Sequence, residues 1–292
     1  MDAPLVLEAP AKLNLCLRVI GRRADGYHLL QSLVVFLDLA DRVALKPAVA
    51  WSLRVSGPFG ANLAGVDNLA LRAGRLMADL AGADTAACAP LAAAIEIDKR
   101  IPVAAGLGGG SADAAAVLRG LGSLWQLDLP LQRLRALAAP LGADLAVCLG
   151  GSAARVGGVG EELAPLSLPS LHLLLVNPGI PVATADVFGR VTPPYEQPLE
   201  MPASLAHRDA VAETAQRFGN SLRAPAISLC PTIAQALDDL SALPSCRMAQ
   251  MSGSGATCFG LFDDAEAAVA AEAALRALRP GWFVRACRSL AG

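Results

Sequence analysis

The sequence predicts an α+β fold, and three observations lead to that prediction. Residues 5–55 are rich in short apolar runs of β-forming residues. A glycine-rich loop at 106–110 then passes directly into an alanine-rich helix, and residues 248–288 follow the order strand, loop, strand, helix, strand. Strands and helices of this kind bury their apolar faces by packing on one another in layers.

The first part of the chain is predicted to be mainly strand. The runs with strand character are 5–7, 13–20, 29–37, 42–45 and 51–55. The hexapeptide G-R-R-A-D-G at 21–26 is typical of a turn. Helical spacing of apolar residues follows from Asn68 to Leu80, with Asp67 or Asn68 as its N-cap. A strand over 92–98 leads to the glycine loop.

The second part of the chain is predicted to alternate helices and strands. Ser111 is expected to be the N-cap of a helix to about 121, and a further helix runs from Pro130 to about 139. A turn around Gly142 and a short segment to Leu149 come next. The remaining elements are a strand at 171–176, helices near 184–190, 207–218 and 231–242, strands at 248–251 and 258–262, a helix at 265–278 and a strand at 282–288.

A glycine-studded stretch at 150–163 separates these two parts of the chain. It predicts a domain boundary near residue 160, which gives one domain over 1–160 and a second over 161–292.

Composition sets limits on the class of protein. The chain is 54% hydrophobic, with a net charge of −2 and a pI near 5.9, which argues against a general nucleic-acid binder. Charged residues interrupt every apolar stretch before the roughly eighteen residues of a membrane span. The amino terminus, M-D-A-P-L-V-L-E-A-P, matches neither a secretory signal nor a transit peptide.

The cysteine pattern is that of a reduced protein. Seven cysteines are odd in number and form no C-x-x-C: positions 16, 88, 148, 230, 246, 258 and 287. They lie in apolar contexts, so we expect thiols buried in a cytoplasmic protein.

The glycine loop carries the strongest functional signal. Residues 106–116 read G-L-G-G-G-S-A-D-A-A-A, so backbone amide groups can crowd against a ligand at the positive end of a helix dipole. Such a site suits phosphate. The Rossmann pattern fails at Ser111, and the Walker pattern fails because no lysine follows the last glycine. Taken alone, the loop is equally compatible with a simple turn between strand and helix.

Four other segments carry polar residues of interest. Lys12 and Asn14 share one face of a strand, Tyr27 and His28 follow a turn, and Asp144 follows a Gly-Ala pair. The fourth segment is a second Gly/Ser loop within M-S-G-S-G-A-T-C-F-G at 251–260. Each has an ordinary structural alternative: a solvated lysine, surface rings, a helix N-cap and a hairpin turn.

In this order the five segments resemble the GHMP small-molecule kinases over nearly the whole chain. The matching motifs are P-A-K-L-N-L, D-G-Y-H-x-L-x-S, I-P-x-x-A-G-L-G-G-G-S-x-D-A-A, G-A-D and S-G-S-G-A-T. The resemblance implies an N-terminal domain like ribosomal protein S5 domain 2 and a ferredoxin-like C-terminal domain. It also implies ATP-dependent phosphorylation of a hydroxyl on a cytidine-diphosphate polyol, in the isoprenoid precursor route that starts from a methylerythritol. The Tyr-His element distinguishes this reading from homoserine or mevalonate kinases.

The resemblance also implies roles for particular residues. The ATP loop would comprise Pro102, Ala104, Ala105, Gly106, Leu107, Gly108, Gly109, Gly110, Ser111 and Ala112. Asp144 would be the catalytic base, with Lys12 beside it keeping the carboxylate ionised and neutralising the transferring phosphoryl group. The substrate would contact Asn14, Tyr27, His28, Thr184 and Phe188, as well as Asp144.

Cofactors and partners follow from the same resemblance. ATP with Mg²⁺ is expected, and no residue is assigned as a metal ligand. The expected partners are two small molecules, with no nucleic acid or membrane, and the chain is expected to be a monomer or weak homodimer.

Two departures and two alternative functions remain open at this point. Where the family has Asn-Asp-Leu-Glu, this chain has Asn220, Ser221, Leu222 and Arg223, and Leu145-Ala146 replaces Val-Pro after Asp144. The alternatives are a kinase or transiently phosphorylating decarboxylase for another alcohol, and a catalytically silent nucleotide-binding regulator.

Overall fold

The computed structural model describes residues 3–61, 63, 65, 67–84 and 91–290 of the chain. Its residues cluster into two compact units, each assembled from several stretches of sequence. The first contains residues 1–11, 39–103 and 108–151, and the second contains residues 12–38, 104–107 and 152–292. The backbone passes from one unit to the other after residues 11, 38, 103, 107 and 151.

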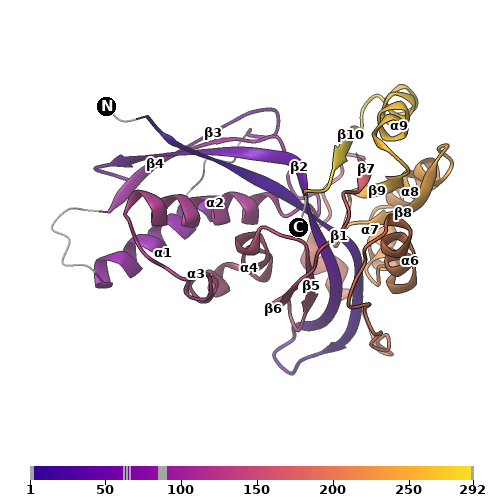
Figure 1. Cartoon of the computed structure of the whole chain (residues 1–292), viewed down its shortest axis with the longest axis horizontal. Coiled ribbons are helices and arrows are strands. Elements are labelled where there is room, and N and C mark those ends of the chain that lie inside the picture. The colour runs from indigo at the N-terminus through magenta and orange to yellow at the C-terminus, as the bar shows by residue number, and fades with distance from the viewer. Residues whose placement is uncertain (1–2, 62, 64, 66, 85–90, 291–292) are drawn as a thin grey trace. The chain divides into compact units, whose positions relative to one another are not determined.

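Helices α1 (Leu69–Asp84) and α2 (Gly109–Leu124) lie side by side against strands in the first unit (Figure 1). In its sheet, β3 (Ser52–Ser56) runs parallel to β4 (Ala92–Asp98), and β4 is antiparallel to the second half of β2 (His28–Ala48). The glycines of the helices allow close packing, because a methyl group at Gly120 would overlap Leu45 and Leu7. Three shorter helices complete this unit: α3 (Leu131–Ala138), η1 (Ala139–Leu141) and α4 (Ala143–Gly150).

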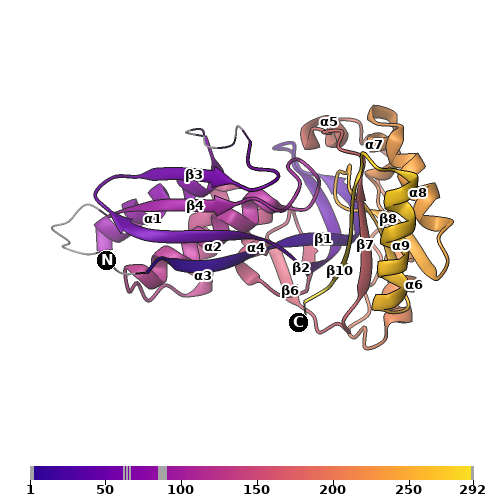
Figure 2. The ribbon, with the colours of Figure 1, turned by 90° about the horizontal axis from the view of Figure 1, so that it is seen from above.

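The second unit contains a four-stranded antiparallel sheet in the order β10-β7-β9-β8. These strands are β7 (His172–Asn177), β8 (Cys246–Met251), β9 (Cys258–Phe262) and β10 (Phe283–Arg288). Helices α8 (Thr232–Ser241) and α9 (Ala265–Leu278) lie along the sheet (Figure 2). The remaining helices are α5 (Thr184–Gly189), α6 (Arg208–Phe218) and α7 (Arg223–Leu229).

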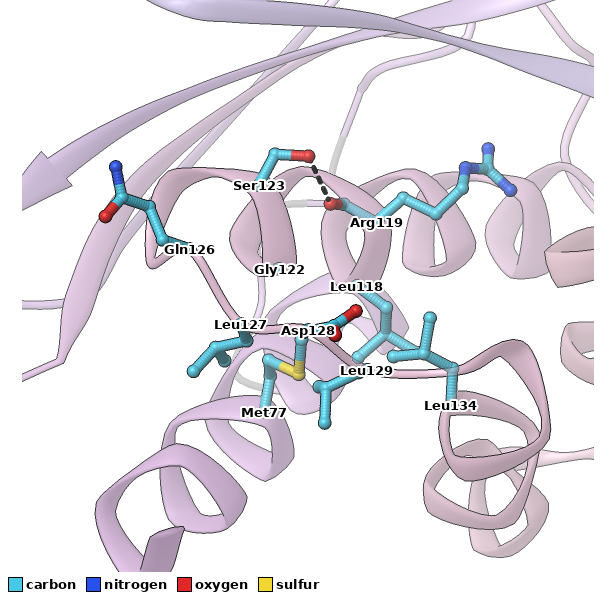
Figure 3. Close-up of a pocket in the computed structure, with 10 residues that line it drawn as sticks. All are labelled: Met77, Leu118, Arg119, Gly122, Ser123, Gln126, Leu127, Asp128, Leu129 and Leu134. Carbon is cyan, nitrogen blue, oxygen red and sulfur yellow. Dashed lines mark hydrogen bonds between the residues drawn. The ribbon is translucent and has the colours of Figure 1, made fainter. Parts of the chain in front are cut away.

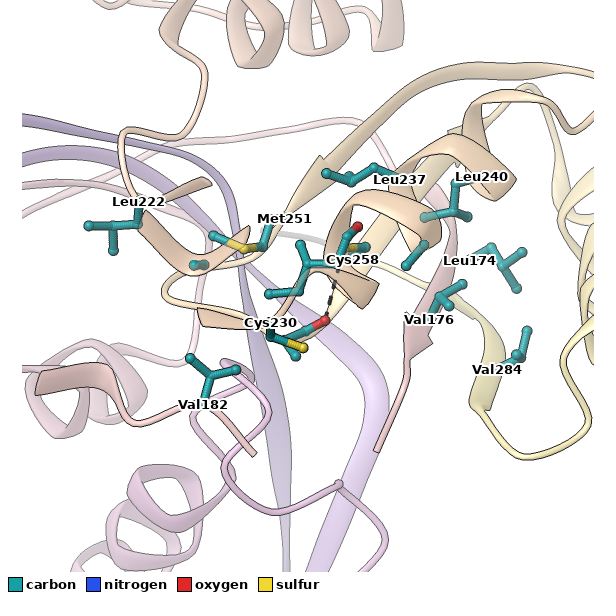
Figure 4. Packing of buried hydrophobic residues seen from close by; sticks show 14 of the residues in the cluster. Leu174, Val176, Val182, Leu222, Cys230, Leu237, Leu240, Met251, Cys258 and Val284 are labelled. Carbon is teal, nitrogen blue, oxygen red and sulfur yellow. Dashed lines mark hydrogen bonds between the residues drawn. The ribbon is translucent and has the colours of Figure 1, made fainter. Parts of the chain in front are cut away.

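The core of the second unit forms where these helices meet the sheet (Figure 4). Leu174 and Val176 from β7 pack with Leu237 and Leu240 from α8 and with Val284 from β10. The cluster also takes in Leu17 and Val19 from β1 (Leu5–Arg22), so the first strand is part of this core. Burial of such side chains is the main contribution to the stability of the unit.

A small antiparallel ladder also belongs to the second unit. The first half of β2 pairs with β5 (Ala154–Gly157), with Ser32 opposite Val156, and β5 pairs with β6 (Glu162–Pro165). The predicted α+β class is confirmed. In the described ranges, no helix is long and apolar enough to cross a membrane.

Several local predictions are confirmed and others are wrong. Asn68 caps α1, since its Oδ1 accepts a 2.9 Å hydrogen bond from the backbone N–H of Ala70. The predicted strands at 5–7 and 13–20 are one continuous strand, β1, and those at 29–37 and 42–45 are likewise one strand, β2. The segment ending at Leu149 is a helix, α4. Lys12 and Asp41 interrupt the apolar runs, but both are buried: the Lys12 N–H donates to the carbonyl oxygen of Leu107, and Asp41 accepts from the Ile101 N–H.

The thiols of the described cysteines are free, as the sequence predicted: Cys16, Cys148, Cys230, Cys246, Cys258 and Cys287. The seventh, Cys88, lies outside the described residues.

Candidate functional site

The two glycine-rich segments meet inside the second unit, although they are far apart in sequence. Ser252 Oγ donates a 3.1 Å hydrogen bond to the carbonyl oxygen of Gly106, and the Thr257 N–H donates to the carbonyl of Ala105 at 3.2 Å. Gly106 has a φ of 74°, and a Cβ there would lie 2.7 Å from the carbonyl oxygen of Ser252. Only glycine fits this position without strain or a clash.

Lys12 and Asn14 lie beside this pair of loops. Lys12 Nζ donates a 2.7 Å hydrogen bond to Asn14 Oδ1, which confirms that the two side chains share one face of β1. Asn14 Nδ2 donates to Ser32 Oγ at 2.8 Å, and the Asn14 N–H donates to Ser252 Oγ at 3.1 Å. A Cβ at Gly253 would lie 3.2 Å from Asn14 Oδ1. The amide of Asn14 is therefore fixed in orientation, and the buried ammonium of Lys12 is held next to the second loop.

The remaining part of the glycine loop, Gly108 to Ala112, belongs to the first unit. Gly108 has a left-handed conformation, with φ 64° and ψ 20°, and α2 starts at the next residue. The prediction that Ser111 caps this helix is wrong, because Ser111 lies inside the first turn and no side chain within the described structure caps α2. The N–H groups of the first turn are thus left to a ligand or solvent.

The other predicted loop residues flank this turn. Ala104 has a φ of 52°, an uncommon value outside glycine, while Pro102 and Leu107 are buried. A Cβ at Gly110 would meet no atom within 4 Å, so the backbone at this position is open to an approaching group. This geometry suits an anion at the N-terminus of a helix.

Asp144 lies in the first turn of α4, in the first unit. The helix starts after Gly142, whose φ of 127° is poorly tolerated by other residues, and the side chain of Asp144 is exposed. A carboxylate is favoured at this end of a helix by the dipole. Lys12 belongs to the second unit.

Two aromatic side chains, Phe188 and Tyr195, lie beside the ring of His28 in the second unit. The His28 ring centroid lies 5.2 Å from that of Phe188, and 6.3 Å from that of Tyr195 in an edge-on arrangement. Burial, and to a lesser extent the nearby charge of Arg22, lowers the pKa of His28, which favours the neutral imidazole at physiological pH. Its Nε2 atom is buried and has no hydrogen-bond partner in the described part of the chain. An unpaired buried nitrogen is costly unless a ligand pairs with it.

Thr184 and Tyr27, the two other predicted substrate contacts near His28, differ in their surroundings. Thr184 Oγ1 lies 2.9 Å from Ser254 Oγ, which ties the start of α5 to the second Gly/Ser loop. Tyr27 is 64% exposed, so a large aromatic surface is open to solvent directly beside His28 in the sequence. Sequence reasoning missed Tyr195, since no motif marks it.

Asn220 is a second residue that sequence reasoning missed. Its Nδ2 donates to the carbonyl oxygens of Met251 at 2.7 Å and Gly253 at 2.9 Å, and so fastens the second loop. Ser221, which departs from the family's motif, pairs with an acid from elsewhere in the chain. Ser221 Oγ donates a 2.6 Å hydrogen bond to Glu196 Oε1, and Glu196 Oε2 lies 2.7 Å from Arg18 Nη1. Glu196, from another segment, thus places a carboxylate against Ser221, one of the two positions where the chain departs from an acid of the motif.

A pocket of about 520 Å³ lies between α1, α2 and α3 (Figure 3). Its lining residues are Met77, Leu118, Arg119, Gly122, Ser123, Gln126, Leu127, Asp128, Leu129 and Leu134. Gly122 is separated from the glycine turn by roughly 20 Å of helix, at 1.5 Å per residue. None of the predicted site residues lines this pocket.

No preformed metal cage is present in the part of the chain that the structure describes. No three His, Cys, Asp or Glu side chains gather there as metal ligands. Mg²⁺ in phosphoryl-transfer enzymes is held largely by phosphate oxygens and water, so the open glycine turn is compatible with a metal that arrives on the nucleotide.

The fold and the paired glycine loops are those of a small-molecule kinase. Two family models match this chain: the GHMP kinases N terminal domain over residues 68–157 and the GHMP kinases C terminal domain over residues 204–280. The chain therefore belongs to the GHMP kinase family, as its motifs predicted.

Particular relatives share nearly the full length of the chain. It is 46% identical over 281 residues to the 4-diphosphocytidyl-2-C-methyl-D-erythritol kinase of Paramagnetospirillum magneticum, with 95% of this chain and 96% of that protein covered. It is 49% identical to the protein of the same name from Paracoccus denitrificans, with 95% and 94% covered.

Solved structures agree with this assignment. A crystal structure of 4-(cytidine 5'-diphospho)-2C-methyl-D-erythritol kinase has a TM-score of 0.79 and 36% identity, and covers 99% of this chain and 100% of its own. A homoserine kinase from Cytophaga hutchinsonii has a TM-score of 0.68 at 17% identity, with 100% and 96% covered, and so shares the fold alone.

Proposed function

We propose that this protein is an ATP-dependent kinase that phosphorylates the 2-hydroxyl of 4-diphosphocytidyl-2-C-methyl-D-erythritol, in the non-mevalonate route to isoprenoid precursors. The observation that carries the substrate assignment is the group of rings around His28. A neutral imidazole with a buried, unpaired Nε2 beside Phe188 is suited to a flat heterocycle with hydrogen-bonding edges. Homoserine and mevalonate offer no such ring. The names of relatives at 46–49% identity support the same substrate.

The roles of the rings follow from their exposure and position. We propose that Tyr27 stacks on the cytosine, that His28 hydrogen-bonds its polar edge and that Phe188 supplies a second aromatic face. Thr184 would add a polar contact, and Asn14, held by Lys12 and Ser32, would contact the substrate near the reacting hydroxyl.

The nucleotide site rests on the glycine loop. The segment from Pro102 to Ala112 would surround the triphosphate, with the uncapped N–H groups of α2 donating to phosphate oxygens. Mg²⁺ would neutralise phosphate charge and be held by phosphate oxygens and water, with no ligand assigned to this chain.

For the chemical step, we propose Asp144 as general base and Lys12 as the neighbouring cation. Asp144 would accept the proton of the 2-hydroxyl while the oxygen of that hydroxyl bonds to the γ-phosphorus of ATP. The bond between the γ-phosphorus and the β–γ bridging oxygen breaks at the same time, and ADP leaves. Lys12 would favour the ionised carboxylate and offset the charge of the transferring group. Residues 1–160 would act as the N-terminal kinase domain and 161–292 as the C-terminal one, in a cytoplasmic monomer or weak homodimer.

Steady-state ADP release tests the proposal directly. The purified protein with ATP and Mg²⁺ should release ADP in proportion to added 4-diphosphocytidyl-2-C-methyl-D-erythritol, and not with homoserine or mevalonate. Turnover on either of those alcohols instead would reassign the acceptor. ATP binding without ADP formation on any candidate would identify a catalytically silent regulator.

A further inference from the structure

A buried cluster of three charged side chains lies directly beneath the start of α2. Lys99 follows β4 and is 5% exposed, Asp41 on β2 is 0% exposed, and Asp113 on α2 is 4% exposed. Lys99 Nζ contacts Asp41 Oδ2 and lies 2.6 Å from Asp113 Oδ2. We refer to these three residues as the charged cluster; all of them belong to the first unit.

The charged cluster touches the glycine turn through Gly109, the first residue of α2. A Cβ at Gly109 would lie 3.1 Å from Lys99 Nζ, so the ammonium fills the space that a side chain would need. Asp41 also fixes the chain leading to the loop, because its Oδ1 accepts from the N–H groups of Arg100 at 2.5 Å and Ile101 at 2.8 Å. These contacts set the backbone on both sides of the turn.

The charge of the cluster is not balanced when both acids are ionised. Asp41 accepts from one ammonium and two N–H groups, as expected of a carboxylate. Asp113 pairs only through Oδ2, and its Oδ1 is buried with no hydrogen-bond partner among the described residues. With both acids ionised the cluster carries a net −1, and a proton on Asp113 makes it neutral.

Resting on the function proposed above, we propose that the charged cluster positions the phosphate-binding turn and that nucleotide binding there is coupled to protonation of Asp113. The phosphates of ATP are anions, so they favour the neutral cluster over the negative one. Binding should therefore take up a proton at Asp113.

The protonation state of Asp113 is poised for this coupling. The pKa of Asp113 is raised to about 7, chiefly by burial and also by the Asp41 carboxylate, while the Lys99 ammonium opposes both effects. A bound anion moves the pKa upward again, so nucleotide affinity falls as the pH rises above about 7. If nucleotide binding raises the pKa of Asp113 by one unit, the Kd for the nucleotide changes about tenfold across the titration.

Apart from the half-buried Arg119, whose Nη1 donates a 3.0 Å hydrogen bond to the carbonyl oxygen of Cys148, the other charged groups near α2 lie at the surface. Helices α1 and α4 pack on α2, and their described charged side chains, Arg72, Arg75, Asp79 and Asp144, are exposed. The buried titratable group of α4 is the Cys148 thiol. On the strands beneath α2, the charged side chains of Glu8, Arg42, Lys46 and Glu96 are exposed as well. Asp98, at the end of β4, is half-buried and pairs with Arg100 at 2.7 Å.

The test compares ATP binding by calorimetry in the full-length protein and in Asp113→Asn, with saturating Mg²⁺, from pH 6 to 9. The Kd values of the wild type and the variant should agree near pH 6. By pH 9 the wild-type Kd should be about tenfold larger than that of the variant. Titration of ATP itself cancels in this ratio. Asp79→Asn, an exposed acid on α1, is the matched control and should follow the wild type.

A second measurement needs no variant. At pH 8.5, where ATP is fully ionised, calorimetry in two buffers of different ionisation enthalpy should detect proton uptake by the wild type on binding. A constant Kd ratio between wild type and Asp113→Asn across the pH range, or binding without proton uptake, would overturn the inference. Failure of the wild type to bind ATP at any pH would instead refute the proposed function.

Discussion

The side chain of Asn220 donates a 2.9 Å hydrogen bond to the carbonyl oxygen of Gly253, in the middle of the second Gly/Ser loop. The same amide nitrogen donates to Met251, and Gly253 lies against Asn14. One amide therefore supports the loop that lies beside Lys12.

Replacing Asn220 with alanine should loosen this loop. Two partly buried carbonyl groups lose their donor, which should cost about 1–3 kcal/mol of stability. We expect a lower unfolding temperature by calorimetry and a reduced kcat/KM in the ADP-release assay. Gln132→Ala, an exposed amide on α3, is the control and should change neither quantity. A fully stable and active Asn220→Ala would show that the loop is held by other contacts.

The glycine loop offers a matched pair of substitutions. Gly106→Ala combines a φ of 74° with a Cβ only 2.7 Å from the Ser252 carbonyl, whereas Gly110 lies in a helix with no atom within 4 Å of an added Cβ. Gly106→Ala should destabilise the fold by about 1–3 kcal/mol, as strained backbone positions do. Gly110→Ala should keep its unfolding temperature but raise KM for ATP, because a methyl group blocks phosphate approach. Equal stability of the two variants would contradict the loop geometry, and an unchanged KM for ATP in Gly110→Ala would place the phosphates elsewhere.

Asp144→Asn tests the catalytic base. An amide cannot accept the hydroxyl proton, so kcat should fall by about 10²–10⁴ with little change in ATP affinity. Single-turnover kinetics and ATP binding should be measured on the same preparation. Asp128→Asn, another exposed acid of the first unit, serves as control. A near-normal kcat in Asp144→Asn would remove this residue from the mechanism.

Tyr27→Ala tests the stacking surface. Loss of a base–aromatic contact is worth about 1–3 kcal/mol, so KM for the cytidine substrate should rise markedly. KM for ATP should stay the same. Tyr27→Phe keeps the ring and should behave like the wild type. Equal losses of affinity for both substrates in Tyr27→Ala would contradict the separation of the two binding regions.

Three thiols of the second unit should resist modification, two of them buried and one, that of Cys246, half-buried. Burial raises the pKa of Cys16 and of Cys258 to about 12, and that of Cys246 to about 11. Since the thiolate is the reactive form, these three should remain unmodified by a maleimide at pH 8, as read by peptide mass spectrometry. Unfolding in guanidinium should expose all three to the reagent. Rapid labelling of Cys258 in the folded protein would show that the core of the second unit opens readily.

Much of the fold could be predicted from the sequence because its signals are local. Apolar spacing, a capping Asn68 and the glycines of two loops identify most helices and strands. Predictions failed where a distant partner decides the local structure. Residues 5–22 form one strand although Lys12 interrupts the apolar runs, because the Lys12 N–H donates to the carbonyl oxygen of Leu107 and its buried ammonium donates to Asn14. Ser111 could not be recognised as a helical residue, since the left-handed backbone of Gly108 starts the helix instead.

The sequence by itself determined the family, the phosphate-binding character of the glycine loop and the residue types available for chemistry, because motifs and helix ends depend on neighbours along the chain. Only the tertiary structure decided that Ser252 meets Gly106, that Glu196 supplies an acid to Ser221 and that Lys99 lies between Asp41 and Asp113. The physical reason is that burial and hydrogen bonding act through space. They join residues that are far apart in the sequence, and the sequence positions alone do not indicate which of these residues are in contact.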